Sequence, residues 1–167
     1  MKQRVLLAMA FVTNPSLLIA DEPTTALDVT VEAQILSLLK NLISEYNSTI
    51  IYITHDLGVV SEIADRVAVF YAGRVVEVND RDSIFNKPQH PYTEALINCL
   101  PDDKKDKKLN VIPGDIPDLS ELPSGCNFHP RCNYKQDKCC KEKPPLFETN
   151  SGGRSACFFH EKVGNIS

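Results

Sequence analysis

Two short apolar runs, each followed at once by polar residues, constrain the fold of this chain more than any other feature. The run "LLIA" at 17–20 precedes an Asp–Glu pair, and "TIIYIT" at 49–54 precedes a His–Asp pair. Between them, apolar residues recur at helical spacing over 29–46. This order predicts two parallel strands joined by a crossover helix, with both polar pairs at one edge of the sheet.

The segments around this unit extend the same pattern. We expect a helix over 2–12, ended by "TNPS", and a short helix over 56–64. The stretch "RVAVFYAGRVVEV" at 66–78 predicts two strands joined at Ala–Gly, a hairpin at the edge of the parallel sheet. Short helices are predicted over 81–85 and 93–99. The expected fold class is therefore α/β, a parallel sheet with an edge hairpin.

The composition changes after residue 100. The stretch "PDDKKDKK" predicts a charged, solvated linker over 101–110, and 111–167 is rich in Pro, Gly and Cys with little periodicity. We therefore expect four parts. They are an α/β domain over 1–80, a short helical segment over 81–100, the linker, and a loop-rich extension over 111–167.

Composition and charge exclude several classes of protein. The formal net charge is −4, and neither half has the basic surface typical of direct nucleic-acid binding. No apolar run approaches the ~20 residues that span a bilayer. The apolar N-terminal run is interrupted by "TNPS" and lacks a small-residue cleavage site, so we expect no secretion signal.

The polar residues at the strand ends are candidates for phosphate chemistry, because ligands of open α/β sheets bind there. Asp21 could hold Mg²⁺, Glu22 could orient or deprotonate a water molecule, and His55 could donate a hydrogen bond to a γ-phosphate. Helix capping is the alternative for the acids, and a structural role is the alternative for the histidine. Two polar sites at adjacent strand ends favour the functional interpretation.

Five of the six cysteines lie beyond residue 125, which favours a local site over a disulfide framework. Four of them follow a C-x5-C-x6-C-x17-C spacing: Cys126, Cys132, Cys139 and Cys157. Such thiols could ligate Zn²⁺ or an iron–sulfur cluster, although the C-x2-C pairs of common zinc sites are missing. Free thiols are the alternative. Cys140 could substitute for its neighbour, whereas Cys99 is typical of a buried helix residue.

Two stretches closely resemble the second half of an ABC-transporter ATPase subunit of the dipeptide/oligopeptide importer branch. They are "MKQRVLLAMAFVTNPSLLIADEPTTALDVTVEAQIL" and "IIYITHDLGVVSEIADRVAVFYAGRVVE". The resemblance covers residues 1 to about 100, and "KPQHPYTEALINCLP" looks like the start of that branch's C-terminal extension. It implies the C-terminal half of a P-loop, RecA-like ATPase core over 1–80.

The resemblance also implies roles for individual residues. Met1 falls on the last residue of the signature sequence that begins Leu-Ser-Gly-Gly. Asp21 would hold Mg²⁺ with ATP, Glu22 would act on the attacking water, Asp28 would make contacts across an ATPase dimer, and His55 would contact the γ-phosphate. The cysteine motif resembles one that is associated with a [4Fe-4S] cluster in some subunits of this branch.

No G-x-x-x-x-G-K-[ST] motif occurs in the sequence, so the loop that cradles phosphates in P-loop enzymes is missing. We therefore expect the C-terminal part of a split or truncated ATPase, inactive on its own.

The resemblance implies a set of partners. They are a second ATPase subunit, two transmembrane permeases and an extracytoplasmic peptide-binding protein, with peripheral attachment on the cytoplasmic side of the plasma or inner membrane. Two alternative functions stay open. One is an ATP-inert remnant that acts as a metal-binding or regulatory module, and the other is the equivalent subunit of a nickel importer.

Overall fold

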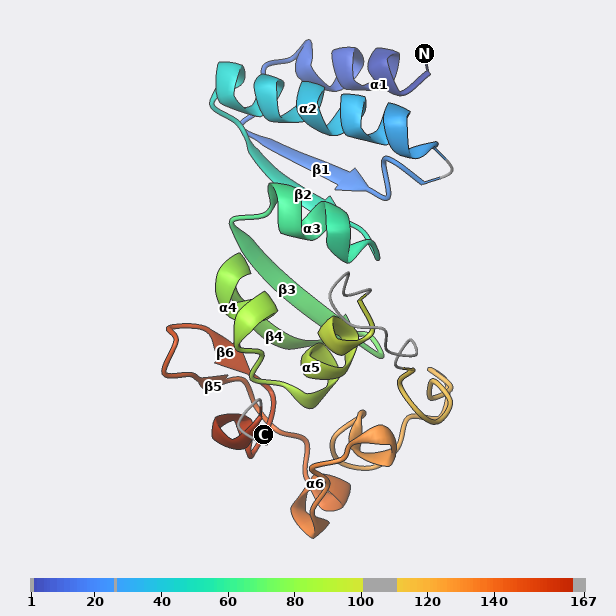
Figure 1. Cartoon of the computed structure of the whole chain (residues 1–167), viewed down its shortest axis with the longest axis vertical. Helices are drawn as coiled ribbons and strands as arrows, with labels where there is room; N and C mark the ends of the chain where they lie inside the picture. Colours follow the sequence, from blue (N-terminus) through green and yellow to red (C-terminus); the bar gives the residue numbers. More distant parts are fainter. Residues whose placement is uncertain (1, 26, 101–110, 164–167) are drawn as a thin grey trace. The chain divides into compact units, whose positions relative to one another are not determined.

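The computed structural model describes residues 2–25, 27–100 and 111–163. Its contacts divide the chain into two compact units, Met1–Ile63 and Ala64–Ser167, which Figure 1 shows in blue to green and in green to red. The predicted linker over 101–110 lies outside the described residues. The other predicted domain boundaries stay predictions. No helix in the described residues is long and apolar enough to cross a bilayer.

The first unit has the predicted strand–helix–strand order. Its elements are α1 (Lys2–Phe11), β1 (Leu17–Asp21), α2 (Val29–Tyr46), β2 (Thr49–Ile53) and α3 (Leu57–Ile63). The two strands pair in parallel, and their register places the last residue of β1 opposite the last residue of β2. The residues that follow both strands therefore meet at one edge of the sheet, as the sequence predicts.

The ends of α2 follow from its sequence. The carboxylate of Asp28 accepts the backbone N–H of Val31 at 2.9 Å and so caps the first turn. Asn47 ends the helix in the left-handed conformation, with φ 50°. The helix buries one apolar face in the core of the unit, formed by Ile35, Leu36 and Leu39.

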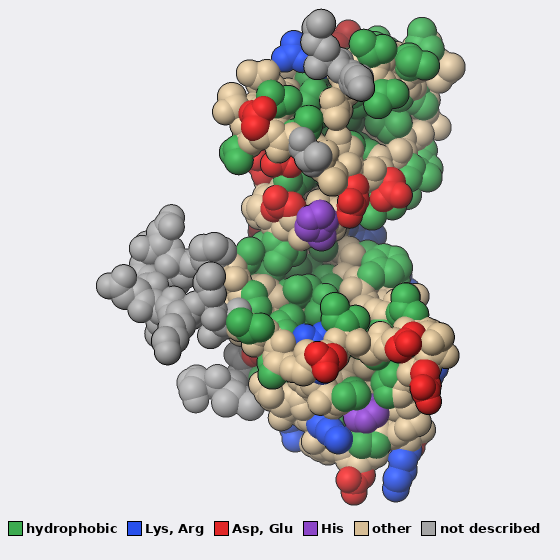
Figure 2. All heavy atoms as spheres, turned by 90° about the vertical axis from the view of Figure 1, so that its right-hand side faces the viewer, with side chains coloured by type: hydrophobic (Ala, Val, Ile, Leu, Met, Phe, Trp, Pro, Cys, Tyr) green, Lys and Arg blue, Asp and Glu red, His purple; other side chains and the backbone are tan. Residues whose placement is uncertain are grey.

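The sheet of the first unit has one apolar face that the described residues leave uncovered. Side chains alternate along both strands, and the outward set is exposed by 46–62% although it is apolar. This set comprises Leu17, Ile19, Ile51 and Ile53. Figure 2 likewise shows many hydrophobic side chains at the surface of the upper unit. We call these four residues the open sheet face.

The second unit contains both helices and short strands. Its elements are β3 (Arg66–Tyr71), β4 (Arg74–Asp80), α4 (Arg81–Asn86), α5 (Pro91–Asn98), α6 (Asp137–Lys141), β5 (Phe147–Glu148) and β6 (Arg154–Ser155), with single 3₁₀ turns at His129–Arg131 and His160–Lys162.

The predicted hairpin is present in this unit, as β3 and β4, but it belongs to a different sheet from the one predicted. The strand order of this sheet is β3-β4-β6-β5, and every pairing is antiparallel. The prediction that the hairpin lies at the edge of the parallel sheet is therefore wrong. Instead, β6 from the C-terminal extension pairs with the free edge of β4.

Aromatic rings hold the extension to the hairpin. Tyr71 of β3 lies 4.6 Å from Tyr92 of α5 and 5.1 Å from Phe128 of the extension, measured between ring centroids. Val76 of β4 is buried in the same cluster. Arg131 donates to the Tyr71 hydroxyl at 3.5 Å and, within the extension, to the backbone carbonyls of Ile112 at 3.0 Å and Pro113 at 2.9 Å.

A buried carboxylate fixes the start of α5. Glu77 of β4 is fully buried, and its two oxygens accept the backbone N–H groups of Gln89 at 2.7 Å and His90 at 2.9 Å. Burial raises the pKa of Glu77, and these hydrogen bonds oppose that rise. The Nδ1 atom of His90 in turn accepts the backbone N–H of Tyr92 at 3.1 Å and caps α5.

Candidate functional site

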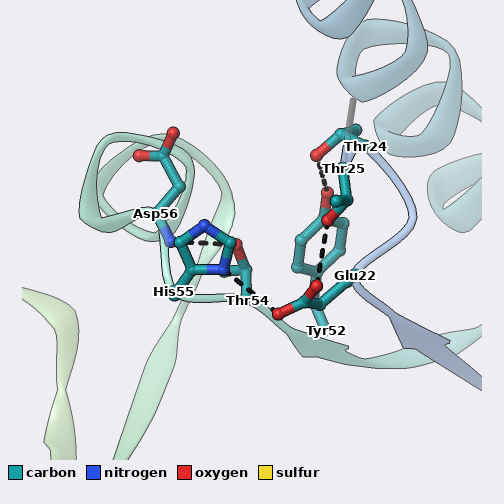
Figure 3. A network of polar contacts seen from close by, with 7 residues as sticks. All are labelled: Glu22, Thr24, Thr25, Tyr52, Thr54, His55 and Asp56. Carbon is teal, nitrogen blue, oxygen red and sulfur yellow. Dashed lines mark hydrogen bonds and ion pairs between the residues drawn. The ribbon is translucent and has the colours of Figure 1, made fainter. Parts of the chain in front are cut away.

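Two of the predicted site residues, Glu22 and His55, meet at the carboxyl edge of the parallel sheet. The backbone N–H of Glu22 donates to the carbonyl of Ile53 at 2.9 Å, which ties the residue to the end of β2. The Nδ1 atom of His55 lies 3.1 Å from Oε1 of Glu22 (Figure 3). An ionised carboxylate only accepts hydrogen bonds, so Nδ1 carries the hydrogen in this contact. His55 therefore donates through Nε2 as well only when its ring is doubly protonated.

The turn after β1 shapes the other side of the carboxylate. The backbone N–H of Thr25 donates to the carbonyl of Glu22 at 3.2 Å, closing a turn with Pro23 at its second position. The Thr25 hydroxyl donates across the same turn to Oε2 of Glu22 at 3.1 Å (Figure 3). Both carboxylate oxygens are thus hydrogen-bonded to side chains, one from the segment after β1 and one from the segment after β2.

A second hydroxyl contact holds this turn to β2. The hydroxyls of Thr24 and Tyr52 lie 3.1 Å apart, and Thr24 is buried. Burial raises the pKa of Tyr52, which keeps its hydroxyl neutral. No sequence pattern indicated a functional role for Thr24, Thr25 or Tyr52. The only available signal was the order Glu-Pro-Thr-Thr, which is typical of a turn but does not indicate where its side chains point.

Electrostatics keep the Glu22 carboxylate ionised. The hydrogen bond from His55, and next that from Thr25, lower the pKa of Glu22 below its usual value. Its side chain is 47% exposed and that of His55 is 79% exposed, so water reaches both groups. A lowered pKa weakens a general base. This arrangement is therefore better suited to orienting a water molecule than to removing its proton.

The two other acidic candidates lie at the ends of the same loop. Asp21 is the last residue of β1, and its side chain is exposed. Asp28 is bonded to the first turn of α2, so one of its oxygens is already used in capping. The predicted contact of Asp28 across a dimer and the predicted Mg²⁺ role of Asp21 stay predictions.

The predicted cysteine set converges on one cavity of the second unit. All four cysteines line this cavity of about 20 Å³, which has room for one water-sized molecule. Its walls also include His90, Phe128 and His129. Cys99 and Cys140 are not among the lining residues. The fold thus brings together thiols that are 31 positions apart at the extremes, from Cys126 to Cys157.

Burial favours the neutral form of three of these thiols. Burial raises the pKa of Cys126, that of Cys132 to about 11 and that of Cys157 to about 12. Within the described residues, no group of three or more Cys, His, Asp or Glu side chains is placed so that it could hold a metal ion. The residue types suit a metal centre, but their placement does not, and the small cavity does not fit a cluster. The iron–sulfur prediction therefore gains no support from the side-chain geometry.

Comparisons with known proteins give two kinds of match. Residues 76–139 match the family described as oligopeptide/dipeptide transporter, C-terminal region. The whole chain is similar to the oligopeptide transport ATP-binding protein AppD of Bacillus subtilis, with 52% identity over 165 residues that cover 98% of this chain and 50% of the relative.

Two relatives from Brucella species match this chain over a similar share of its length. The putative peptide import ATP-binding protein BOV_A0348 of Brucella ovis is 47% identical over 170 residues, 98% of this chain and 50% of the relative. The putative peptide import ATP-binding protein BAB2_1052 of Brucella abortus is 52% identical over 156 residues, 93% of this chain and 46% of the relative. The chain spans about half the length of the relatives it matches.

Proposed function

This chain is homologous over almost its whole length to peptide-import ATP-binding proteins, and on that premise we propose that it is the C-terminal portion of an ATP-hydrolysing subunit of an ABC transporter for dipeptides or oligopeptides. The observation that carries the proposal is the contact between His55 and Glu22, 3.1 Å long, at the ends of adjacent parallel strands. Such strand ends are where phosphate ligands of α/β sheets bind.

The proposed reaction is hydrolysis of Mg²⁺-bound ATP. Glu22 would orient the attacking water, because its ionised carboxylate is exposed and held at both oxygens. His55 would contact the γ-phosphate through Nε2. Asp21 would contribute to Mg²⁺ binding, since a carboxylate at the end of the strand provides the oxygen ligands that this ion prefers. Asp28 would contact a second ATPase subunit.

ATP hydrolysis requires a phosphate-binding loop that this sequence lacks. The open sheet face supports a requirement for further polypeptide, because parallel sheets are normally covered on both faces and two strands alone are marginally stable. We propose that a second polypeptide segment covers this face and supplies the loop. The chain alone would then hydrolyse no ATP.

A chimera tests this function. This chain would replace the half of the Bacillus subtilis relative that it matches, and ATP hydrolysis would be measured for the chimera and for the chain alone. We expect turnover only in the chimera. Glu22→Gln should abolish that turnover while nucleotide binding persists, whereas the matched substitution Glu121→Gln, at an exposed position, should change neither.

Two outcomes would overturn the proposal. Turnover by the chain alone that is lost in Glu22→Gln would show that no further segment is needed. A chimera that hydrolyses ATP equally fast with and without Glu22→Gln would remove the catalytic assignment of Glu22.

The proposed assembly follows from the same premise. The partners would be a second ATPase subunit, two transmembrane permeases and an extracytoplasmic peptide-binding protein, with this chain on the cytoplasmic side of the membrane. Residues 1–80 would form the ATPase portion, and 81–167 the extension of peptide transporters. The family match starts at residue 76, close to that proposed boundary. The names of the relatives favour peptides over nickel as the substrate.

A second candidate, a metal-binding module, rests on the residue types that line the cysteine cavity, although the described side chains are not placed to hold a metal ion. Four thiols are a donor set that binds iron or zinc. A [4Fe-4S] cluster would need Cys126, Cys132, Cys139 and Cys157 to move outward, because the cavity is too small for it. Anaerobic purification followed by metal analysis tests this candidate. Iron and zinc both below about a tenth of an equivalent would rule it out, since cysteine-ligated metals bind tightly.

A further inference from the structure

We propose that Thr25 is a positioning residue for Glu22, in that its hydroxyl fixes the orientation of the carboxylate that the proposed function assigns to the attacking water. Its catalytic meaning rests on that function, but the contact itself belongs to this chain. The hydroxyl donates to Oε2 at 3.1 Å, and Oε1 is bonded to His55 at the same distance.

Only the two contacts together fix the orientation of the Glu22 carboxylate. The terminal torsion of a glutamate side chain is broad and nearly two-fold, so one hydrogen bond leaves the carboxylate free to rotate. Here the two bonds go to different oxygens and come from different elements, the turn after β1 and the end of β2. The carboxylate plane is therefore fixed relative to the strand ends, which defines where its remaining lone pairs can hold water.

The backbone explains why Thr25 has this position. Glu22 has a left-handed φ of 45°, and its carbonyl accepts the N–H of Thr25 at 3.2 Å. This turn folds the fourth residue back beside the first, so a hydroxyl at the fourth position reaches the carboxylate of the first. A serine would serve the same purpose, whereas valine has the shape of threonine but no donor.

The neighbouring threonine provides an internal comparison. Thr24 is buried and its hydroxyl contacts Tyr52, so it holds the turn to β2. Thr25 is exposed, and its hydroxyl contacts Glu22. Exposed hydrogen bonds add little to stability. We infer that the Thr25 hydroxyl acts on the carboxylate and not on the fold.

The experiment measures how far the Glu22 side chain reorients in the purified chain, at one neutral pH and without nucleotide. ¹³C relaxation of its side chain gives an NMR order parameter, and Glu22→Gln assigns the signal. Thr25→Val should lower the order parameter, because one of the two hydrogen bonds that fix the carboxylate is lost. Thr25→Ser should restore the wild-type order parameter, and Thr24→Val should leave it unchanged.

Each outcome decides the proposal. An unchanged order parameter in Thr25→Val overturns it, as does an equal decrease in Thr24→Val, which would indicate a general disturbance of the loop. Circular dichroism confirms that the variants fold. Because no nucleotide is involved, this result is independent of the chimera experiment, so failure of the positioning role and failure of the proposed function are distinguishable.

Discussion

The Oε2 atom of Glu77 on β4 accepts the backbone N–H of His90 at 2.9 Å, so a fully buried carboxylate holds the residue that begins α5. Its other oxygen accepts the N–H of Gln89. This pair links the hairpin to the helix next to the cysteine cavity, because His90 also lines that cavity.

Glu77→Ala should destabilise the second unit. The substitution leaves one buried and one partly buried backbone N–H group without an acceptor, which costs about 2–5 kcal/mol. Hydrogen exchange of peptides covering 87–98 should accelerate strongly. The matched control is Glu148→Ala at an exposed position of β5, which should leave exchange in that region unchanged. Equal protection in Glu77→Ala would contradict a clamping role.

Stability of the second unit should fall as the medium becomes acidic. Burial lowers the pKa of His90 to about 3 from an ordinary value of 6.5. Between these values the unfolded chain binds a proton that the folded chain does not. The contribution of His90 is therefore full above pH 6.5 and is lost as the pH falls toward 3, by up to about 1.4 kcal/mol per pH unit.

Hydrogen exchange at several pH values measures how the free energy of unfolding of the second unit changes with pH. His90→Asn is the matched variant. Asparagine retains a capping acceptor and does not titrate in this range. The variant should have a lower stability at neutral pH but a shallower loss below pH 6.5. Identical slopes in both proteins would mean that other groups cause the dependence.

Arg131→Gln should release the start of the C-terminal extension. The guanidinium donates to the carbonyls of Ile112 and Pro113, and glutamine lacks the planar fork that makes both contacts. Limited proteolysis should cleave near residue 112 faster than in the wild type. Lys135→Gln, at an exposed position nearby, is the charge-matched control. If both variants are cleaved at the wild-type rate, the Arg131 contacts are not needed to hold the segment near residue 112.

Asp28→Ala should destabilise the first unit by about 0.5–2 kcal/mol, the usual cost of losing a helix cap. Asp28→Asn should retain most of the stability, because its amide oxygen can still accept the N–H of Val31. Urea unfolding followed by the helical circular dichroism signal measures both variants. Equal midpoints for Asp28→Ala and the wild type would show that the cap contributes nothing.

The helices of residues 1–100 and the long strands could be read from the sequence because their signals are local, whereas α6 lies in the segment predicted to be loop-rich. The apolar periodicity of α2, the β-branched run of β2 and the Ala–Gly turn between β3 and β4 each lie within about twenty residues. Glu22 and His55 were also predictable, because each directly follows a strand and the register of a parallel pair brings strand ends together.

The pairing of β4 with β6 and the side of Glu22 that Thr25 occupies were not predictable in this way. Strands of two residues, such as Arg154–Ser155, carry no periodicity, so only the free edge of β4 selects them as partners. The sequence alone determined which segments form the longer helices and strands of residues 1–100 and which polar residues end them, because hydrogen-bonding patterns and side-chain periodicity are local. The tertiary structure alone decided which edges pair, which hydroxyl reaches which carboxylate oxygen and which thiols share a cavity, because these depend on distances between segments that no local pattern encodes.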